Sequence, residues 1–322
     1  MEVETRKGRT MRILVVGAGA TGGYFGARLA EAGRDVTFLV RPARAEALAA
    51  RGLRVLSPVG DLTIDAPQTV TADRLAAAGP FDCVLLSAKA YDLDGALADV
   101  APAVGPVTAV LPILNGMRHL DRLDAAFGAD KVLGGSCSIV ATLTTAGEIR
   151  QMTELHTLTY GERDGSRSER VAAIEAQMDG VRFQARTSDK ILLEMWEKWV
   201  FLATLAGATT LMRGAIGDIV AAPGGKAFIE GLLDECQAVA VAKGYGSREK
   251  VLAGARKILT TEGSAMTASM LRDIEGGARI EADHIVGDLI ERGRAEGVET
   301  PLLARVFTHL KTYENRRARE AA

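Results

Sequence analysis

Residues 12–23 read RILVVGAGATGG, an apolar run that passes directly into a glycine-rich turn. Gly17, Gly19 and Gly22 fit the spacing G-x-G-x-x-G, and Ala20 and Thr21 stand between the last two glycines. The first glycine permits a tight turn, the second lets a pyrophosphate approach the backbone, and the third lets a helix pack on the strand. The positive end of that helix attracts phosphate groups. The stretch therefore predicts a strand, turn and helix that bind a dinucleotide, with a purely structural glycine turn as the alternative.

Short apolar runs and helical stretches alternate through the first half of the chain. Strands are expected at residues 12–16, 36–40, 81–87 and 107–114. One helix is expected after the glycine run 17–23, to about Ala32, and another at 44–51. The stretch 53–70, interrupted by polar residues and prolines, is typical of short antiparallel strands. Strands separated by helices in this order predict an α/β fold with a doubly wound parallel sheet, the Rossmann architecture.

The second half of the chain has a different pattern. Residues 131–183 favour strand-like pieces, and from Ser188 or Asp189 onward the pattern is helical. Further helices are expected around 227–243, 247–259 and 280–296, and Thr300 followed by Pro301 is a typical start for the last one. We expect a disordered extension over residues 1–10, a Rossmann domain over 11–185 and an all-helical domain over 186–322.

The end of the second expected strand decides which dinucleotide is favoured. NAD-binding folds place an acid there for the ribose 2′-hydroxyl, but Asp35 precedes the strand in this chain. The carboxyl end of the strand carries Arg41, with Arg44 one helical step away. A guanidinium matches a 2′-phosphate in shape and charge, so NADP(H) is the expected cofactor. The alternative is that both arginines lie in a solvated loop.

Composition and charge exclude several classes of protein. The chain of 322 residues has 39 Lys plus Arg against 41 Asp plus Glu, which leaves no basic footprint for nucleic acid. Its three cysteines are far apart and odd in number, which indicates a reducing compartment, and its histidines lack metal-site spacing. No segment is apolar enough for a membrane span, and no signal peptide is evident. We expect a cytoplasmic protein with no metal, membrane or nucleic-acid partner.

Three groups of residues could take part in chemistry. Lys89 and the pair Asn115-Gly116 follow expected strands, and open α/β sheets bind ligands beyond the carboxyl ends of their strands. Ser269, Asp273 and Glu281 fall in a polar segment broken by glycines, although a carboxylate is favoured at a helix start in any case.

Lys198 is the third candidate, because it lies in WEKWVF, a helix that is apolar on almost every side. A structural role is the alternative. Its stem would cover Trp196 or Trp199, or its ammonium would pair with Glu194 one turn earlier.

Several pieces of the chain, in this order, resemble the ketopantoate reductases (2-dehydropantoate 2-reductases). They are RILVVGAGATGG, the strand-ending Arg41, LLSAKAYD, LNG, WEKWVF, SMLRDIEGGARIEADHIVG and the proline in GVETP. The similarity extends from Met11 to about Glu314, and the set is far more specific than the glycine loop alone. The resemblance implies an N-terminal Rossmann domain, a helical C-terminal domain, and NADPH-dependent reduction of a 2-keto acid. The default reaction is 2-dehydropantoate to pantoate, in pantothenate biosynthesis.

The resemblance also implies roles for single residues. Lys198 matches the catalytic lysine of the family and Glu281 its acidic partner, so Lys198 would act as general acid on the substrate carbonyl. Asn115 matches the asparagine that contacts cofactor and substrate. Ser269 and Asp273 match positions near the substrate carboxylate.

One further match and one departure complete the comparison with the family. Lys89 matches a lysine that lines the cofactor site. The family usually has asparagines four and eight residues after the catalytic lysine, on the same helix face, but this chain has Leu202 and Ala206 there. Both positions are expected to lie beside the substrate. Because neither Leu202 nor Ala206 has a side-chain amide, the identity of the substrate is an open question.

Three functions remain open from the sequence. The first is reduction of ketopantoate, and the second is the same chemistry on a more apolar 2-keto acid. The third is an NADP-binding regulator without turnover, which the presence of Lys198 and Glu281 argues against. The expected partner is a small-molecule 2-keto acid, and a homodimer is one assembly the chain could form.

Overall fold

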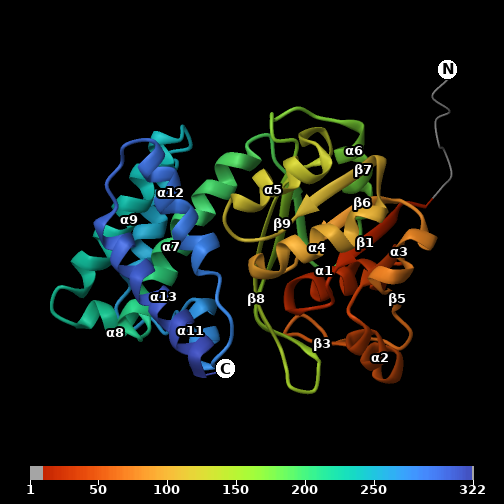
Figure 1. Ribbon diagram of the computed structural model, residues 1–322, viewed down its shortest axis with the longest axis horizontal. Helices are drawn as coiled ribbons and strands as arrows, with labels where there is room; N and C mark the ends of the chain where they lie inside the picture. The colour runs from red at the N-terminus through yellow and green to blue at the C-terminus, as the bar shows by residue number, and fades with distance from the viewer. Residues whose placement is uncertain (1–9, 321–322) are drawn as a thin grey trace. The chain divides into compact units, whose positions relative to one another are not determined.

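The computed structural model describes residues 10–320, which form two compact units. The first unit comprises the chain up to Leu114 together with His119–Ile191, and the second comprises Asn115–Arg118 and the chain from Leu192 onward. In Figure 1 the first unit runs from red to green and the second is mostly green to blue. Residues 1–9 of the expected extension lie outside the described residues.

The first unit contains a five-stranded parallel sheet in the order β5-β2-β1-β6-β7. Its strands are β1 (Arg12–Val16), β2 (Asp35–Leu39), β5 (Gln68–Val70), β6 (Phe81–Leu86) and β7 (Val104–Pro112). Leu14 and Val15 of β1 are fully buried, as expected for a central strand with helices on both faces. The expected α/β fold is confirmed, and Pro112 ends the edge strand β7, where a missing N–H is tolerated.

Helices connect these strands. They are α1 (Ala20–Glu31), α2 (Pro42–Arg51), α3 (Ala72–Ala78), α4 (Leu93–Val100) and α5 (Arg118–Phe127), with short 3₁₀ turns at Ala90–Asp92, Ala101–Ala103 and Ala129–Lys131. Pro42 starts α2 because its fixed φ suits the first helical position. Gly52 and Gly79 follow α2 and α3 with positive φ, which glycine adopts without strain.

A second sheet in the same unit has the order β10-β9-β3-β4, with β8 paired to β9. Its strands are β3 (Leu53–Leu56), β4 (Leu62–Ile64), β8 (Gly134–Leu143), β9 (Ile149–Gly161) and β10 (Gln184–Thr187). The antiparallel pairing of β3 and β4 is confirmed. The expectation is wrong for β5, which leaves this sheet after Pro67 and pairs in parallel with β2 of the first sheet.

The sequence did not predict α6 (Glu169–Gln177), which lies within the stretch expected to form strands. Its start carries a recognisable signal, because the Ser168 hydroxyl accepts a hydrogen bond from the Val171 N–H at 3.2 Å. Val171 and Ile174, three residues apart, bury one face of the helix.

The second unit is built from helices, as expected (Figure 1). They are α7 (Ile191–Met212), α8 (Ile216–Ala221), α9 (Gly225–Ala242), α10 (Glu249–Leu259), α11 (Ser269–Glu275), a π-helical turn (Asp283–Gly287), α12 (Asp288–Ala295) and α13 (Pro301–Glu320). α13 begins at Pro301 as predicted, and the Glu235 carboxylate accepts the N–H groups of Leu302 and Leu303 at 2.9–3.1 Å. A side chain distant in sequence thus satisfies two of the N–H groups at the helix start.

Hydrogen bonds within the helix account for the buried polar residues of α7. The buried hydroxyls of Thr204, Thr209 and Thr210 each donate to the carbonyl four residues earlier, at 2.6–2.8 Å. Trp196 is buried and stacks on Tyr245, with ring centroids 5.7 Å apart. The helix can therefore be buried on nearly all sides without unsatisfied groups in these threonines.

Residues 10–320 contain neither a candidate membrane span nor a candidate metal site. Among these residues no helix combines the length and the apolar character that crossing a membrane requires. Nor do they contain a group of three or more His, Cys, Asp or Glu side chains placed to hold a metal ion.

Candidate active site

The glycine loop after β1 needs its glycines for two different reasons. Gly17 has φ +91°, a conformation that side chains disfavour, and its N–H donates to the Leu39 carbonyl at 2.9 Å. At Gly22 a Cβ would meet the Ser87 hydroxyl at 1.9 Å and the Gly17 carbonyl at 2.7 Å. Gly17 therefore makes the turn, and Gly22 allows α1 to lie against the end of β6.

The start of α1 has the features that a pyrophosphate requires. Gly19 occupies the N-cap position without a side-chain cap, and the first turn has no acidic residue. A Cβ at Gly19 would have no heavy atom within 4 Å, and the following Ala20 and Thr21 are partly exposed. The N–H groups of this twelve-residue helix are thus left for an anion, and its dipole favours negative charge. The residues present fit a dinucleotide.

Arg41 lies at the carboxyl end of β2, as the N-cap residue of α2. Its side chain is 81% exposed and forms an ion pair with Asp92 at 3.0 Å. An exposed pair of this kind contributes little to stability, so the guanidinium can exchange its partner for another anion.

Arg44 differs from the sequence-based expectation of either a phosphate contact or a solvated loop. Its guanidinium donates to the carbonyls of Ala18 at 3.1 Å and Gly147 at 3.0 Å. Burial lowers the pKa of Arg44 from its ordinary value. The side chain therefore fastens the glycine loop, since Ala18 stands between Gly17 and Gly19, and Arg41 is the better candidate for a 2′-phosphate.

Lys89 follows β6 and precedes the 3₁₀ turn Ala90–Asp92, with an exposed side chain. Its carbonyl accepts the Asp92 N–H at 2.9 Å, which closes that turn. Lys89 and the partner of Arg41 therefore lie in the same short turn at the carboxyl end of the parallel sheet.

Asn115 is held by a residue that the sequence did not predict. Its carbonyl oxygen lies 2.6 Å from Nε2 of His284, a side chain only 6% exposed. Gly116 has φ +77°, and a Cβ there would come within 3.0–3.2 Å of the His284 ring and carbonyl. The turn therefore needs glycine both for its conformation and for the close approach of His284.

Lys198 lies on α7, partly buried, between two side chains with defined partners. Glu197 accepts hydrogen bonds from the Arg248 guanidinium at 2.5–2.8 Å, and Trp199 donates from Nε1 to the Ile285 carbonyl at 2.9 Å. These contacts fix the turn of α7 that carries Lys198.

Ser269, Asp273 and Glu281 occupy the segment that leads into the π-helical turn. Ser269 is the exposed first residue of α11, and Asp273 is partly buried four residues later. Glu281 is partly buried directly before the helical segment, and its carbonyl accepts the Ile285 N–H at 3.0 Å. Ile285 thus connects the backbone of Glu281 to α7.

The π-helical turn joins the elements that carry three of the predicted residues into one network of the second unit. His284 contacts Asn115, and Ile285 accepts from Trp199 beside Lys198 and donates to Glu281. A π-turn inserts one extra residue into a helix and is frequent at functional sites. The other predicted cofactor residues, including Gly17 and Arg41, belong to the first unit.

Charged groups surround His284 and Arg118 in this network. Arg118 pairs with Glu291 and lies 3.9 Å from Asp288, which in turn accepts from Arg292 at 3.0 Å. Burial lowers the pKa of His284 and raises the pKa of Asp288. The available sequence signal was the spacing of His284 and Asp288 by four residues, which places both on one helix face, but nothing local indicated Asn115 as a partner.

The two departures from the family pattern differ in exposure. Leu202 is partly exposed, whereas Ala206 is 4% exposed and its carbonyl accepts the Thr210 hydroxyl. Leu202 therefore has more surface to offer a ligand than Ala206.

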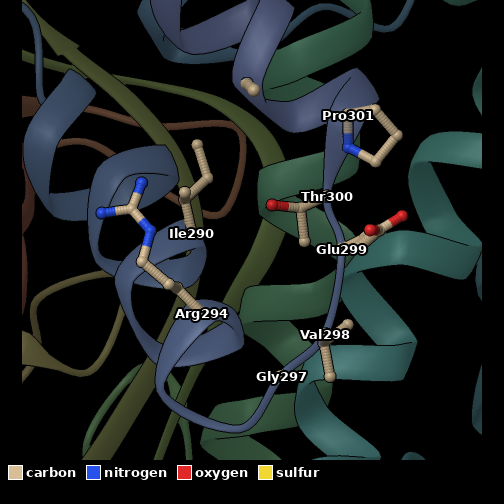
Figure 2. Close-up of a pocket in the computed structure, with 8 residues that line it drawn as sticks. Ile290, Arg294, Gly297, Val298, Glu299, Thr300 and Pro301 are labelled. Carbon is tan, nitrogen blue, oxygen red and sulfur yellow. The ribbon is translucent and has the colours of Figure 1, made fainter.

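A surface hollow of about 460 Å³ lies between the end of α12 and the start of α13. Ile290 and Arg294 line one side, and the loop from Gly297 to Pro301 lines the other (Figure 2). None of the predicted site residues lines this hollow.

Comparison with known families gave matches over most of the chain. The model described as Ketopantoate reductase PanE/ApbA matches residues 13–165, and the model of its C-terminal domain matches residues 190–314. The chain is 38% identical over 304 residues to the "Uncharacterized oxidoreductase YkpB" of Bacillus subtilis, covering 94% of this chain and 99% of that protein. It is 30% identical over 318 residues to a 2-dehydropantoate 2-reductase of Mesorhizobium japonicum, covering 92% and 96% of the two chains.

Solved structures have the same fold. The 2-dehydropantoate 2-reductase of Geobacter metallireducens has a TM-score of 0.85 at 28% identity, over 94% of this chain and 99% of that chain. A D-mandelate dehydrogenase, solved with NADH and anilino(oxo)acetate, has a TM-score of 0.85 at 21% identity, over 96% and 99%. The second likeness shows the fold alone.

Proposed function

The chain belongs to the ketopantoate reductase family of oxidoreductases, and on that premise we propose that it reduces a 2-keto acid to a 2-hydroxy acid with NADPH. The observation that carries the proposal is the network around the π-helical turn. Two hydrogen bonds, from His284 to Asn115 and from Trp199 to Ile285, join the elements that carry Asn115, Lys198 and Glu281. These are the three residues that match the family's catalytic lysine, its acidic partner and its asparagine.

NADPH is the proposed cofactor because of the charge at the end of β2. Arg41 is exposed there and paired with the Asp92 carboxylate, and a 2′-phosphate can take the place of Asp92. The uncapped start of α1 would hold the pyrophosphate, and Lys89 would add a cation at the neighbouring strand end.

The proposed mechanism assigns a task to each of the three side chains. When bound, the reduced nicotinamide supplies the hydride. Lys198 donates a proton to the ketone oxygen as negative charge develops on it. Glu281 hydrogen-bonds the substrate or holds the Lys198 ammonium in position, and the Asn115 amide aligns the reacting groups.

Ketopantoate is the first candidate substrate, and a more apolar 2-keto acid is the second. Ser269 and Asp273 would lie near the substrate carboxylate, as their match to the family implies. Leu202 favours the second candidate, because it offers an apolar surface where the family has an amide. A site that loses hydrogen-bonding groups loses affinity for a polar substrate, since the substrate's polar groups are then desolvated without partners.

Oxidation of NADPH by the purified protein, measured with a panel of 2-keto acids, tests the proposal. Turnover of ketopantoate or of an apolar analogue supports a reductase, and cofactor binding without turnover of any acid supports the non-catalytic regulator. The ratio of kcat/KM for ketopantoate and its deoxy analogue then chooses between the two substrates. We expect the analogue to be favoured, and a preference of about 100-fold for ketopantoate, roughly 2.7 kcal/mol, would overturn that choice.

A further inference from the structure

We propose that His284 is a positioning residue for the reaction, because it fixes the turn that presents the Asn115 side chain. The inference rests on the proposed function in one respect, which is that the Asn115 amide contacts cofactor and substrate. The position of His284 itself follows from geometry within the second unit.

The hydrogen bond between His284 and Asn115 has a defined direction. A backbone carbonyl can only accept, so Nε2 of His284 carries the proton and donates it across 2.6 Å. The bond is short and the ring is 6% exposed, so water competes little for the carbonyl. The proton on Nε2 therefore ties the backbone of Asn115 to the π-helical turn.

A second contact holds the other end of the same turn. Arg118, three residues after Asn115, pairs with Glu291 and approaches Asp288 of α12. Within residues 10–191, Asn115–Arg118 is the one segment that groups with the second unit. A side chain anchors each end of this segment, and Gly116 lies against the His284 ring between them.

The π-helical turn carries His284 and Ile285 next to each other. In this turn the next residue, Ile285, offers its carbonyl to Trp199 of α7, directly beside Lys198. One turn therefore contacts both the asparagine segment through a side chain and the lysine helix through a carbonyl. A shift of about 1 Å in such an arrangement can cost up to about 100-fold in rate, because the reacting groups lose alignment.

The test is a double-mutant cycle between His284 and Asn115. His284→Phe keeps a ring of similar size without the donor, whereas His284→Gln keeps an N–H that can reach the carbonyl. We expect His284→Phe to lower kcat/KM about tenfold to 100-fold and His284→Gln to recover most of the loss. In the Asn115→Ala background, His284→Phe should cost little more, because the amide that His284 positions through the Asn115 carbonyl is already absent.

Two further variants complete the double-mutant cycle, one as a control and one as a substitute. His309→Phe, a histidine of α13 outside the network, controls for loss of a histidine and should leave kcat/KM unchanged. If His284→Phe does not fold in a thermal melt, Gly116→Ala replaces it, because its Cβ would displace the His284 ring. The loss of kcat/KM caused by Gly116→Ala should likewise disappear in the Asn115→Ala background.

The failure of this inference differs from the failure of the proposed function. Additive losses, or equal losses for His284→Phe and His284→Gln, would show a merely structural histidine even in an active reductase. Absence of turnover with every 2-keto acid would overturn the proposed reaction. In that case the double-mutant cycle is measured through the Kd for NADPH. Non-additive changes in this Kd support the positioning role, and additive changes overturn it.

Discussion

The glycine loop of the first unit and the Asn115–Gly116 turn of the second are both built around a glycine with positive φ, but different groups hold them. The N–H of Gly17 donates to the backbone of the neighbouring strand, and the loop continues directly into α1. The Asn115–Gly116 turn depends instead on the side chain of His284, 169 residues away in sequence.

This difference has chemical consequences. The glycine loop is held by backbone groups and by the Arg44 guanidinium, which stays protonated in proteins, so none of these supports titrates near neutral pH. A turn held by an imidazole depends on the protonation state of that ring and on the packing of a distant helix. The first turn suits a task common to all dinucleotides, whereas the second can be adjusted by changing residues outside the turn.

The largest expected effect concerns Lys198, since it decides whether the second unit carries the chemistry. Lys198→Ala should lower kcat by a factor of about 10² to 10⁴, the usual contribution of a general acid, while cofactor affinity stays the same. Lys190→Ala, an exposed lysine one residue before α7, is the control for loss of charge and should leave kcat unchanged. A Lys198→Ala protein that keeps most of its activity, or that unfolds, would assign the lysine a packing role.

The next effect tests the backbone-held turn. Gly22→Ala places a Cβ 1.9 Å from the Ser87 hydroxyl, so α1 must move away from β6. We expect a loss of about 3 kcal/mol in the free energy of unfolding, from overpacking and from the strained hydrogen bond of Ser87 to Val16, together with loss of dinucleotide binding. Urea denaturation and a cofactor titration measure both quantities.

Two further variants make the Gly22 experiment specific. Gly95→Ala, on the exposed face of α4 with open space around the new Cβ, should stabilise the protein by up to about 1 kcal/mol. Adding Ser87→Ala to Gly22→Ala should restore part of the lost stability, because it removes the hydroxyl in the clash. Unchanged stability and cofactor affinity in Gly22→Ala would contradict the close packing described for this loop.

Most of the fold could be predicted from the sequence because its determinants are local. An apolar run followed by a glycine turn gave β1 and α1, and Thr300 followed by Pro301 gave the start of α13. The failures involve competition between local and distant partners. The sequence around β5 predicted an antiparallel strand that pairs with its neighbours in the chain, but β5 pairs in parallel with the edge of β2.

The candidate site was less accessible to prediction. Motifs matched to the family gave Asn115, Lys198 and Glu281, but not the contacts that join their elements. Those contacts involve the His284 side chain and the Ile285 carbonyl, and each spans more than 80 residues of sequence. For Arg44 the local sequence was misleading. Its position three residues after Arg41 suggested a shared ligand, but its guanidinium donates to two backbone carbonyls.

A smaller effect is expected at Arg41, which tests whether the first unit distinguishes between cofactors. A charge-assisted contact contributes about 1.5–3 kcal/mol, so Arg41→Ala should weaken NADPH binding about tenfold to 100-fold and leave NADH nearly unchanged. Arg54→Ala removes another exposed, ion-paired arginine of the first unit and should change neither affinity. Equal losses of NADPH and NADH binding in Arg41→Ala would show a structural arginine.

The smallest effect is a dependence of stability on pH, to which His284 of the side-chain-held turn should contribute. Burial lowers the pKa of His284 from its ordinary value of 6.5, although Glu281 and Asp288 oppose the shift and Arg118 adds to it. Below about pH 6.5 the unfolded chain therefore binds a proton that the folded ring does not, so the free energy of unfolding falls as pH falls. One such group contributes a slope of at most about 1.4 kcal/mol per pH unit.

His284→Gln should flatten this slope, because glutamine keeps a donor for the Asn115 carbonyl but does not titrate. Urea denaturation at several pH values between about 5 and 7.5 measures the slope for wild type and variant. His309→Gln is the matched control, since burial also lowers the pKa of His309 but its ring lies on α13, outside the turn. His284→Gln and His309→Gln should each lose part of the slope and keep reductase activity at pH 7.5. His284→Phe, which lacks the donor, should lose that activity. A slope unchanged by His284→Gln would mean that the buried imidazole binds its proton equally well in the folded and unfolded chain, and that the second turn is no more sensitive to pH than the first.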